Sequence, residues 1–270
     1  MTSISFATLI GTLFGFILVL GAIAYGTDNY YSFLSIEGFA IVIGGSIANS
    51  FMSFQAGSVV QAFWSMGSMF QKPVATREGL NAEILRLIRW AYLVHNKGLA
   101  GLEGEIGKKI KEPLLRYGME LVVTGYSGEV IRGMMNTAVE SEYERRITPV
   151  AVLRNMASTA PAFGMVGTLV GMVIMLQNIQ ADMSLIGTGL AIALLATLYG
   201  ILFARLFCLP AADKLQQKEE ILRFRNFMMT EGLVLLAEKQ TPRYMQDRLN
   251  SFLNPDIHFD LDKYLQNQKK

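Results

Sequence analysis

Four long apolar stretches dominate the hydrophobic pattern of this chain. They cover about residues 4–25, 39–60, 157–176 and 185–205, and a short connection joins the first two and the last two. A helix needs about 20 mostly apolar residues to cross roughly 30 Å of hydrocarbon, where an open backbone group finds no partner. The pattern therefore predicts an all-α integral membrane protein with four transmembrane helices.

Helical periodicity continues outside these stretches, with apolar residues spaced among polar ones. One stripe consists of Leu80, Ile84, Leu87 and Ile88, and similar spacing recurs over 129–146 and 215–236. Such stripes usually form the packed faces of helices, so we expect a helical domain built from the segment between spans two and three and from the C-terminal tail. The predicted parts are a first hairpin (1–71), a helical domain (72–154), a second hairpin (155–209) and a C-terminal helix and tail (210–270).

The distribution of positive charge predicts the orientation. Lys and Arg are absent from residues 1–71 and 155–204, and all 24 of them lie in 72–154 or from Arg205 onward. Because positively charged loops stay in the cytoplasm, the helical domain and both termini are expected inside and the short connections outside. The N-terminal stretch lacks the basic residues of a cleaved signal peptide, so the first span is expected to remain. A net charge of +2 gives no reason to expect a nucleic-acid partner.

The predicted spans lack a buried carboxylate. None of the 22 acidic residues falls in the middle of a span, and the nearest, Glu37, lies at the outer edge of the second. An ionisable residue inside the membrane is the usual mark of an ion path. If this chain moves ions, a partner is expected to supply the charge, and a solitary channel or transporter stays open as the alternative of a different class.

Small and hydroxyl-bearing residues occupy the third and fourth spans. Gly164, Gly167 and Gly171 lie on one helical face, where they allow close approach of another helix, either from this chain or from a partner. Thr168 and Thr197 lie deep in the two spans. Each hydroxyl either bonds the carbonyl four residues earlier or faces a common cavity as an oxygen ligand.

Two prolines lie near the inner ends of these spans. Pro161 is close to the cytoplasmic start of the third and Pro210 follows the fourth. A proline removes one backbone donor and opens the helix around it. Each proline either fits a local turn or forms a hinge that couples the bilayer to the helical domain.

The run APAFGMVGTLVGM at residues 160–172 resembles the third-span signature of flagellar stator A subunits, the MotA/PomA family. Other stretches are similar to the family in the same order along the chain. Residues 43–46 resemble its second span, 98–103 its cytoplasmic segment, 194–200 and 209–215 its fourth span and exit, and 231–243 its tail. The resemblance covers nearly the whole chain and the same four-span layout.

The resemblance implies a motor part and not an enzyme. In the family, five A subunits surround a dimer of single-span MotB/PomB-type B subunits in the lipid of the bacterial inner membrane, and the B helix carries the aspartate that binds the ion. Inward passage of H+ or Na+ turns the A ring, whose cytoplasmic domain pushes on the rotor protein FliG. No cofactor is implied. Pro161 and Pro210 match prolines thought to couple ion flow to movement, and Thr168 matches a hydroxyl that faces the partner aspartate. An energy-transducing subunit of the ExbB/TolQ kind is the alternative, but it usually has three spans.

Two positions depart from the family pattern. Its rotor-facing segment has an arginine eight residues before a glutamate, whereas here the glutamate is Glu103, the earlier position is His95, and Lys97 is the nearest cation. Sodium-driven relatives tend to have two threonines where this chain has Ala196 and Thr197. The lost hydroxyl removes an oxygen ligand, which weakens a sodium site more than a proton path. The pattern favours protons and leaves sodium open.

Overall fold

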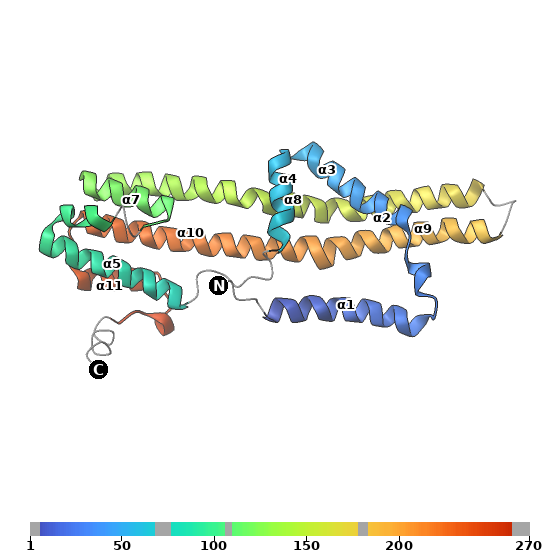
Figure 1. The fold of residues 1–270 in the computed structure, drawn as a ribbon, viewed down its shortest axis with the longest axis horizontal. Helices are drawn as coiled ribbons and strands as arrows, with labels where there is room; N and C mark the ends of the chain where they lie inside the picture. Colours follow the sequence, from blue (N-terminus) through green and yellow to red (C-terminus); the bar gives the residue numbers. More distant parts are fainter. Residues whose placement is uncertain (1–5, 68–76, 106–109, 178–182, 261–270) are drawn as a thin grey trace. The chain divides into compact units, whose positions relative to one another are not determined.

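The computed structural model describes residues 6–67, 77–105, 110–177 and 183–260, and these parts of the chain are helical with no strand (Figure 1). Four helices are long and apolar enough to cross a membrane, which confirms the predicted fold class. The chain forms two compact units. The membrane unit consists of Met1–Lys72 and Ile147–Gln217, and the helical unit consists of Pro73–Arg146 and Lys218–Lys270.

Two long helices contribute to both units. They are α8 (Gly128–Gln177) and α10 (Leu209–Ala237). The unit boundaries at 146/147 and 217/218 differ from the predicted boundaries at 154/155 and 209/210, because each helix runs without a break through the change from charged to apolar sequence. Residues on both sides of the predicted boundaries share one buried cluster, which includes Leu153 and Met156 at the first boundary and Cys208 and Ala211 at the second.

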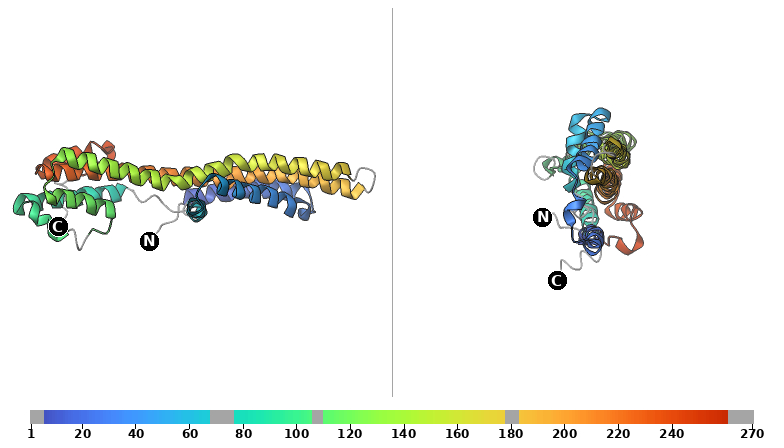
Figure 2. Two further views of the ribbon diagram at one scale, coloured as in Figure 1. Left: turned by 90° about the horizontal axis from the view of Figure 1, so that it is seen from above. Right: turned by 90° about the vertical axis from the view of Figure 1, so that its right-hand side faces the viewer.

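The third and fourth spans are the apolar part of α8 and the helix α9 (Met183–Leu202), which run alongside each other in Figures 1 and 2. The fourth span then passes through a π-helical segment, η5 (Phe203–Cys208), directly into α10. Pro210 lies at the second position of α10. Because proline has no N–H and its ring crowds the preceding turn, the wider π-helical turn before it relieves that crowding.

The first span is α1 (Phe6–Gly26). The second is assembled from η1 (Tyr30–Phe33), α2 (Ile36–Phe39), the π-helical η2 (Ala40–Gly44) and α3 (Gly45–Ser53).

The second span ends at Ser53, earlier than the predicted residue 60. Phe54 and Gln55 are extended, with ψ of 160° and 138°, and α4 (Ala56–Met66) leaves in another direction (Figure 1). Val59 and Ala62 of α4 are fully buried in the cluster shared with α8 and α10. The predicted range therefore joined two helices, because the residues around the break are all uncharged and no pattern marks it.

The helical unit contains the remaining elements, together with the charged ends of α8 and α10. These elements are α5 (Arg77–Lys97), η4 (Leu99–Leu102), α7 (Pro113–Thr124), α11 (Pro242–Asn250) and η6 (Pro255–Ile257). The predicted stripe on α5 is buried in the core, where it packs with Met119, Ile131 and Leu233. Gly232 lets α10 approach α5 closely, because an added methyl there would lie 2.3 Å from Leu87.

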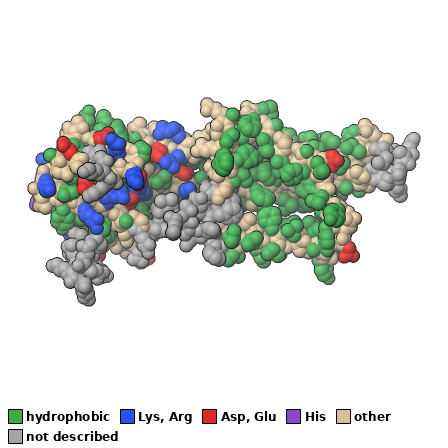
Figure 3. Space-filling model, viewed as in Figure 1, with side chains coloured by type: hydrophobic (Ala, Val, Ile, Leu, Met, Phe, Trp, Pro, Cys, Tyr) green, Lys and Arg blue, Asp and Glu red, His purple; other side chains and the backbone are tan. Residues whose placement is uncertain are grey.

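Charge separates the two units. On the visible face in Figure 3, hydrophobic side chains cover most of the membrane unit, whereas Lys, Arg, Asp and Glu gather over the helical unit. Leu13, Phe14 and Ile17 of α1 are each at least half exposed, as expected for side chains that face lipid. The structure thus supports a multi-pass membrane protein.

The helical unit also buries part of its charge. The Arg225 side chain is 11% exposed and forms ion pairs with Glu83 and Glu112. Glu219 is 6% exposed, and its nearest cation is Arg146, whose Nη1 lies 3.8 Å from Oε2. Burial raises the pKa of Glu219, an effect that Arg146 and Lys218 oppose in part.

This raised pKa predicts how stability depends on pH. The folded chain holds the Glu219 proton more tightly than the unfolded chain. The contribution of Glu219 to the free energy of unfolding is therefore most favourable below its ordinary pKa of about 4.3 and is lost as the pH rises through the raised pKa. In the unaltered chain the thermal unfolding midpoint should fall between about pH 5 and pH 8, and we expect this fall to be smaller in Glu219→Gln. The control is Glu220→Gln, which removes the neighbouring exposed carboxylate. Equal pH profiles for the two variants would contradict the assignment.

Candidate functional site: paired hydroxyls between α8 and α9

Thr168 and Thr197 meet between α8 and α9. Their Oγ1 atoms lie 2.7 Å apart, and both side chains are half-buried. The Thr168 hydroxyl also lies 3.1 Å from the Gly164 carbonyl and 3.3 Å from the Ala193 carbonyl. The bond to Gly164 is the i−4 bond expected of a threonine in a membrane helix. The first of the two uses that the sequence left open is therefore present, and the two hydroxyls also face each other.

The pair offers unused oxygen lone pairs. Each hydroxyl has one proton to donate and two lone pairs, and the Thr197 oxygen lies 3.5 Å from the Gly164 carbonyl. Whichever hydroxyl donates to the other, each oxygen keeps at least one lone pair. The arrangement can accept a hydrogen bond from a protonated group or contribute to the coordination of a hard cation.

Three glycines on α8 make this approach possible. A methyl at Gly164 would lie 3.0 Å from the Ala196 carbonyl oxygen, one at Gly167 would lie 2.3 Å from the Ala196 methyl, and one at Gly171 would lie 2.5 Å from the Gly189 carbonyl oxygen. All of these neighbours belong to α9 of the same chain. Of the two uses that the sequence left open, the structure shows packing within the chain, because α9 already fills the space beside the three glycines.

The Ala196 side chain faces Gly167 and adds no oxygen to the hydroxyl pair. Ala196 is fully buried. Its backbone nitrogen lies 3.3 Å from where a methyl on Gly38 would be. Ala196 therefore separates α9 from α8 and α2, and a larger side chain here would press on these close contacts.

The two prolines lie within continuous helix. The α8 helix runs through Pro161, and Pro210 follows the π-helical segment. Gly200 of α9 touches the backbone just before Pro161, since a methyl on Gly200 would lie 2.6 Å from the Ala160 carbonyl oxygen. Pro161 thus lies beside a closely packed contact, and Pro210 follows a stretch of altered helix geometry.

The charged residues predicted at the rotor lie at the end of α5. His95 and Lys97 occupy its last turn, Gly98 ends the helix with a φ of +67°, and Glu103 follows η4. His95, Lys97 and Glu103 are all exposed. All three lie at or just after the C-terminal end of α5, because only the four-residue η4 separates Glu103 from the glycine that ends this helix.

Two polar contacts in the membrane unit escaped the sequence patterns. The Tyr199 hydroxyl donates to the Phe33 carbonyl at 2.5 Å and accepts from the Ser35 N–H at 2.9 Å, which ties α9 to the start of the second span. Asn49 on α3 donates to Asn155 on α8 at 2.9 Å. Their partners are more than 100 positions away, so the only available signal was a polar residue inside an apolar stretch.

Comparisons with known proteins agree over almost the whole chain. The MotA/TolQ/ExbB proton channel family matches residues 107–225. PomA, a chemotaxis protein of Vibrio alginolyticus, is 32% identical over 248 residues, which are 92% of this chain and 95% of PomA. The uncharacterized protein YtxD of Bacillus subtilis is 32% identical over 93% of this chain and 92% of its own. Motility protein A of Borreliella burgdorferi is 30% identical over 92% of this chain and 94% of its own.

Solved structures share the fold. The C. jejuni MotAB structure matches with a TM-score of 0.80, and the flagellar MotAB stator complex of Bacillus subtilis with 0.79. Both matches have 24% sequence identity and cover 93% of this chain and 96% of the other. The curated relatives match beyond the shared channel region and include the first pair of spans, which disfavours the ExbB/TolQ alternative. Because PomA and motility protein A are at least 30% identical to it over 92% of its length, the chain belongs to the MotA/PomA family of the MotA/TolQ/ExbB proton channel proteins.

Proposed function

We propose that this chain is the ion-conducting stator subunit of a bacterial flagellar motor, in which inward ion flow drives rotation and torque. The observation that carries the proposal is the contact between Thr168 and Thr197. It places two oxygen ligands inside spans that contain no acidic or basic residue over 155–177 and 183–204. Oxygen ligands without a charge form an incomplete ion site, and the missing charge is then the contribution of a partner.

The proposed partner is a MotB/PomB-type B subunit with one span and a buried aspartate. Met165, Leu169 and Val173 are 62%, 60% and 53% exposed along one side of α8, which supports this side as the surface for a partner helix. The glycine face cannot serve, because α9 already occupies it. As in the family, we expect five copies of the chain around a B dimer in the inner membrane, with both termini in the cytoplasm.

The proposed ion is the proton. Ala196 supplies no second hydroxyl beside Thr197, and its methyl is enclosed by Gly167. A sodium ion must replace several water oxygens as it loses its hydration shell, whereas a proton needs only a chain of hydrogen bonds. Two adjacent hydroxyls supply such a chain, so the site suits proton transfer better than sodium coordination.

The proposed contact with the rotor protein FliG lies at the end of α5. Glu103, Lys97 and His95 expose both signs of charge there, and exposed charges contribute mainly to orientation and association rate. Such a contact weakens as salt screens it. In this assignment Lys97 takes the positive role that an arginine has elsewhere in the family, beside His95 at the position of that arginine.

The hydroxyl pair predicts a specific loss of ion flow. Replacing both threonines, Thr168→Val and Thr197→Val, keeps their shape but removes both oxygens. We expect at least a tenfold fall in proton flux into vesicles that contain the chain with its B partner, because each lost oxygen removes a charge-assisted hydrogen bond worth about 1.5–3 kcal/mol. The matched control is Thr137→Val, whose hydroxyl bonds Gly133 on an exposed face of the helical unit. Flux is measured with a pH-sensitive dye in sodium-free buffer.

Unchanged flux in the double variant would remove the hydroxyl pair from the ion path. In the unaltered complex, sodium uptake without proton uptake, followed with a sodium-sensitive dye after sodium is added, would instead contradict the choice of proton and leave the path itself in place. The two outcomes are separated because the same vesicles are measured before and after sodium addition.

The hinge assignment predicts uncoupling without loss of assembly. With Pro161→Ala, α8 regains a backbone donor, and we expect complexes to form and motility to fall. Gly200→Ala provides the comparison, because its methyl would strike the Ala160 carbonyl and should also reduce the amount of assembled complex. Swimming speed and the yield of purified complex are the two measurements. Normal swimming of the Pro161→Ala strain would show that this proline is not a hinge.

A further inference from the structure

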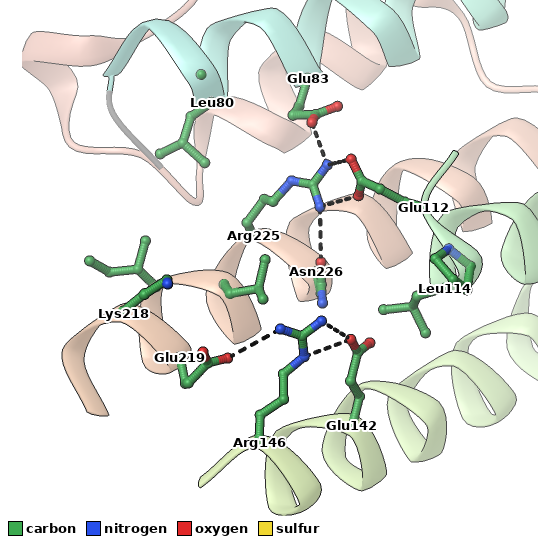
Figure 4. Close-up of a pocket in the computed structure, with 14 residues that line it drawn as sticks. Leu80, Glu83, Glu112, Leu114, Glu142, Arg146, Lys218, Glu219, Arg225 and Asn226 are labelled. Atoms are coloured by element: carbon green, nitrogen blue, oxygen red, sulfur yellow. Dashed lines mark hydrogen bonds and ion pairs between the residues drawn. The ribbon is translucent and has the colours of Figure 1, made fainter. Parts of the chain in front are cut away.

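A cavity of about 430 Å³ lies within the helical unit, where α5, α7, α8 and α10 meet (Figure 4). This volume falls in the range of small-molecule sites, about 300–1,000 Å³. Its walls include the apolar side chains Leu80, Leu114 and Leu222 and a group of charged side chains. The cavity is separate from the hydroxyl pair and from the exposed charges at the end of α5.

Both arginines of the cavity are already paired. Arg225 donates to the two Glu112 oxygens at 2.5 and 3.0 Å and also to Glu83. Arg146 donates to Glu142 at 2.9 Å. Figure 4 shows these guanidinium groups turned toward their carboxylates. An anionic ligand would have to displace a carboxylate of the chain to reach either arginine.

Among the described residues that line the cavity, the unmet hydrogen-bonding groups are acceptors. Glu219 Oε2 and Glu83 Oε2 are buried and accept no hydrogen bond. Arg86 Nη1 lies 3.2 Å from the Glu83 oxygen as an ion pair, whereas the nearest cationic nitrogen to the Glu219 oxygen is 3.8 Å away. A buried carboxylate oxygen without a donor is costly. The cavity is therefore short of donors, most clearly at Glu219.

A metal ion does not match the lining of a cavity that lacks hydrogen-bond donors. No group of three His, Cys, Asp or Glu residues in the described ranges is arranged to hold one. The apolar part of the wall would also leave most of a metal ion's coordination positions empty. A ligand that combines N–H donors with an alkyl body matches both features of the cavity.

We propose that this cavity binds a small aliphatic amine, whose ammonium group donates to Glu219 and whose alkyl chain packs against Leu80, Leu114 and Leu222. The positive charge balances the Glu219 carboxylate, and the N–H groups supply the donors that Oε2 lacks. Lys218, which also lines the cavity, lowers the pKa of Glu219 through its charge but forms no ion pair with it among the described residues. The proposal does not depend on the role of the chain in the flagellar motor.

Equilibrium binding of radiolabelled butylamine to the purified full-length chain tests the proposal, with the thermal unfolding midpoint as a second readout. We expect saturable binding and a rise in the midpoint, since a ligand that binds only the folded state stabilises it. Glu219→Gln keeps the shape and removes the charge, and we expect it to weaken binding by about tenfold or more. Glu220→Gln, at the adjacent exposed position, should leave the affinity within about twofold.

Two further comparisons keep the test decisive. Tetramethylammonium has the same charge but no N–H donor and should not compete, and Leu114→Trp should block binding by filling the cavity without touching Glu219. Equal competition by tetramethylammonium, unchanged affinity in both Glu219→Gln and Leu114→Trp, or preferential binding of butyrate would each overturn the proposal. Absence of saturable binding to the unaltered chain would overturn it as well.

Discussion

The close approach of α8 and α9 is the contact on which the membrane unit depends. Within hydrocarbon, burial of apolar side chains gives helices little reason to associate, so small residues and interhelical hydrogen bonds decide where they meet. At Gly171 an added methyl would lie 2.5 Å from the Gly189 carbonyl and 2.6 Å from the Ala193 nitrogen. Because backbone touches backbone here, the neighbouring Thr168 and Thr197 oxygens come within 2.7 Å. The glycines thus set the geometry of the hydroxyl pair.

The packing of the glycines against α9 limits where a partner helix can approach the hydroxyl pair. The face that carries them is occupied within the chain, whereas Met165, Leu169 and Val173 remain open along another side of α8. A second helix that carries a carboxylate can approach on that side without displacing α9. The close packing therefore aligns the hydroxyls and leaves this side of α8 open to a partner.

Some of this arrangement could be predicted from the sequence and some could not. Long apolar stretches specify membrane helices because the bilayer imposes a minimum length, and the α5 stripe specifies a buried face. The break at Phe54 left no pattern, because the residues on both sides of it are uncharged. Thr168 and Thr197 are 29 positions apart, and their contact depends on the register between α8 and α9. Neither helix encodes this register alone.

Buried charge was the least predictable feature. Glu219 lies in the run KEE at 218–220, which is typical of a solvated helix face, yet it is 6% exposed while Glu220 is exposed. Its burial depends on α8, which contributes Arg146 from 73 positions earlier. The same holds for Arg225, whose carboxylate partners come from α5 and from the residue before α7. Only the packing of separate helices selects which charges are enclosed.

The central claim is that this chain holds half of an ion path. Ion flux into vesicles tests it most directly, when the purified chain is compared alone and together with its single-span B partner at equal amounts. The account predicts flux only when both proteins are present and none when the partner's membrane aspartate is replaced by asparagine. Selective, robust current through the chain alone would contradict it.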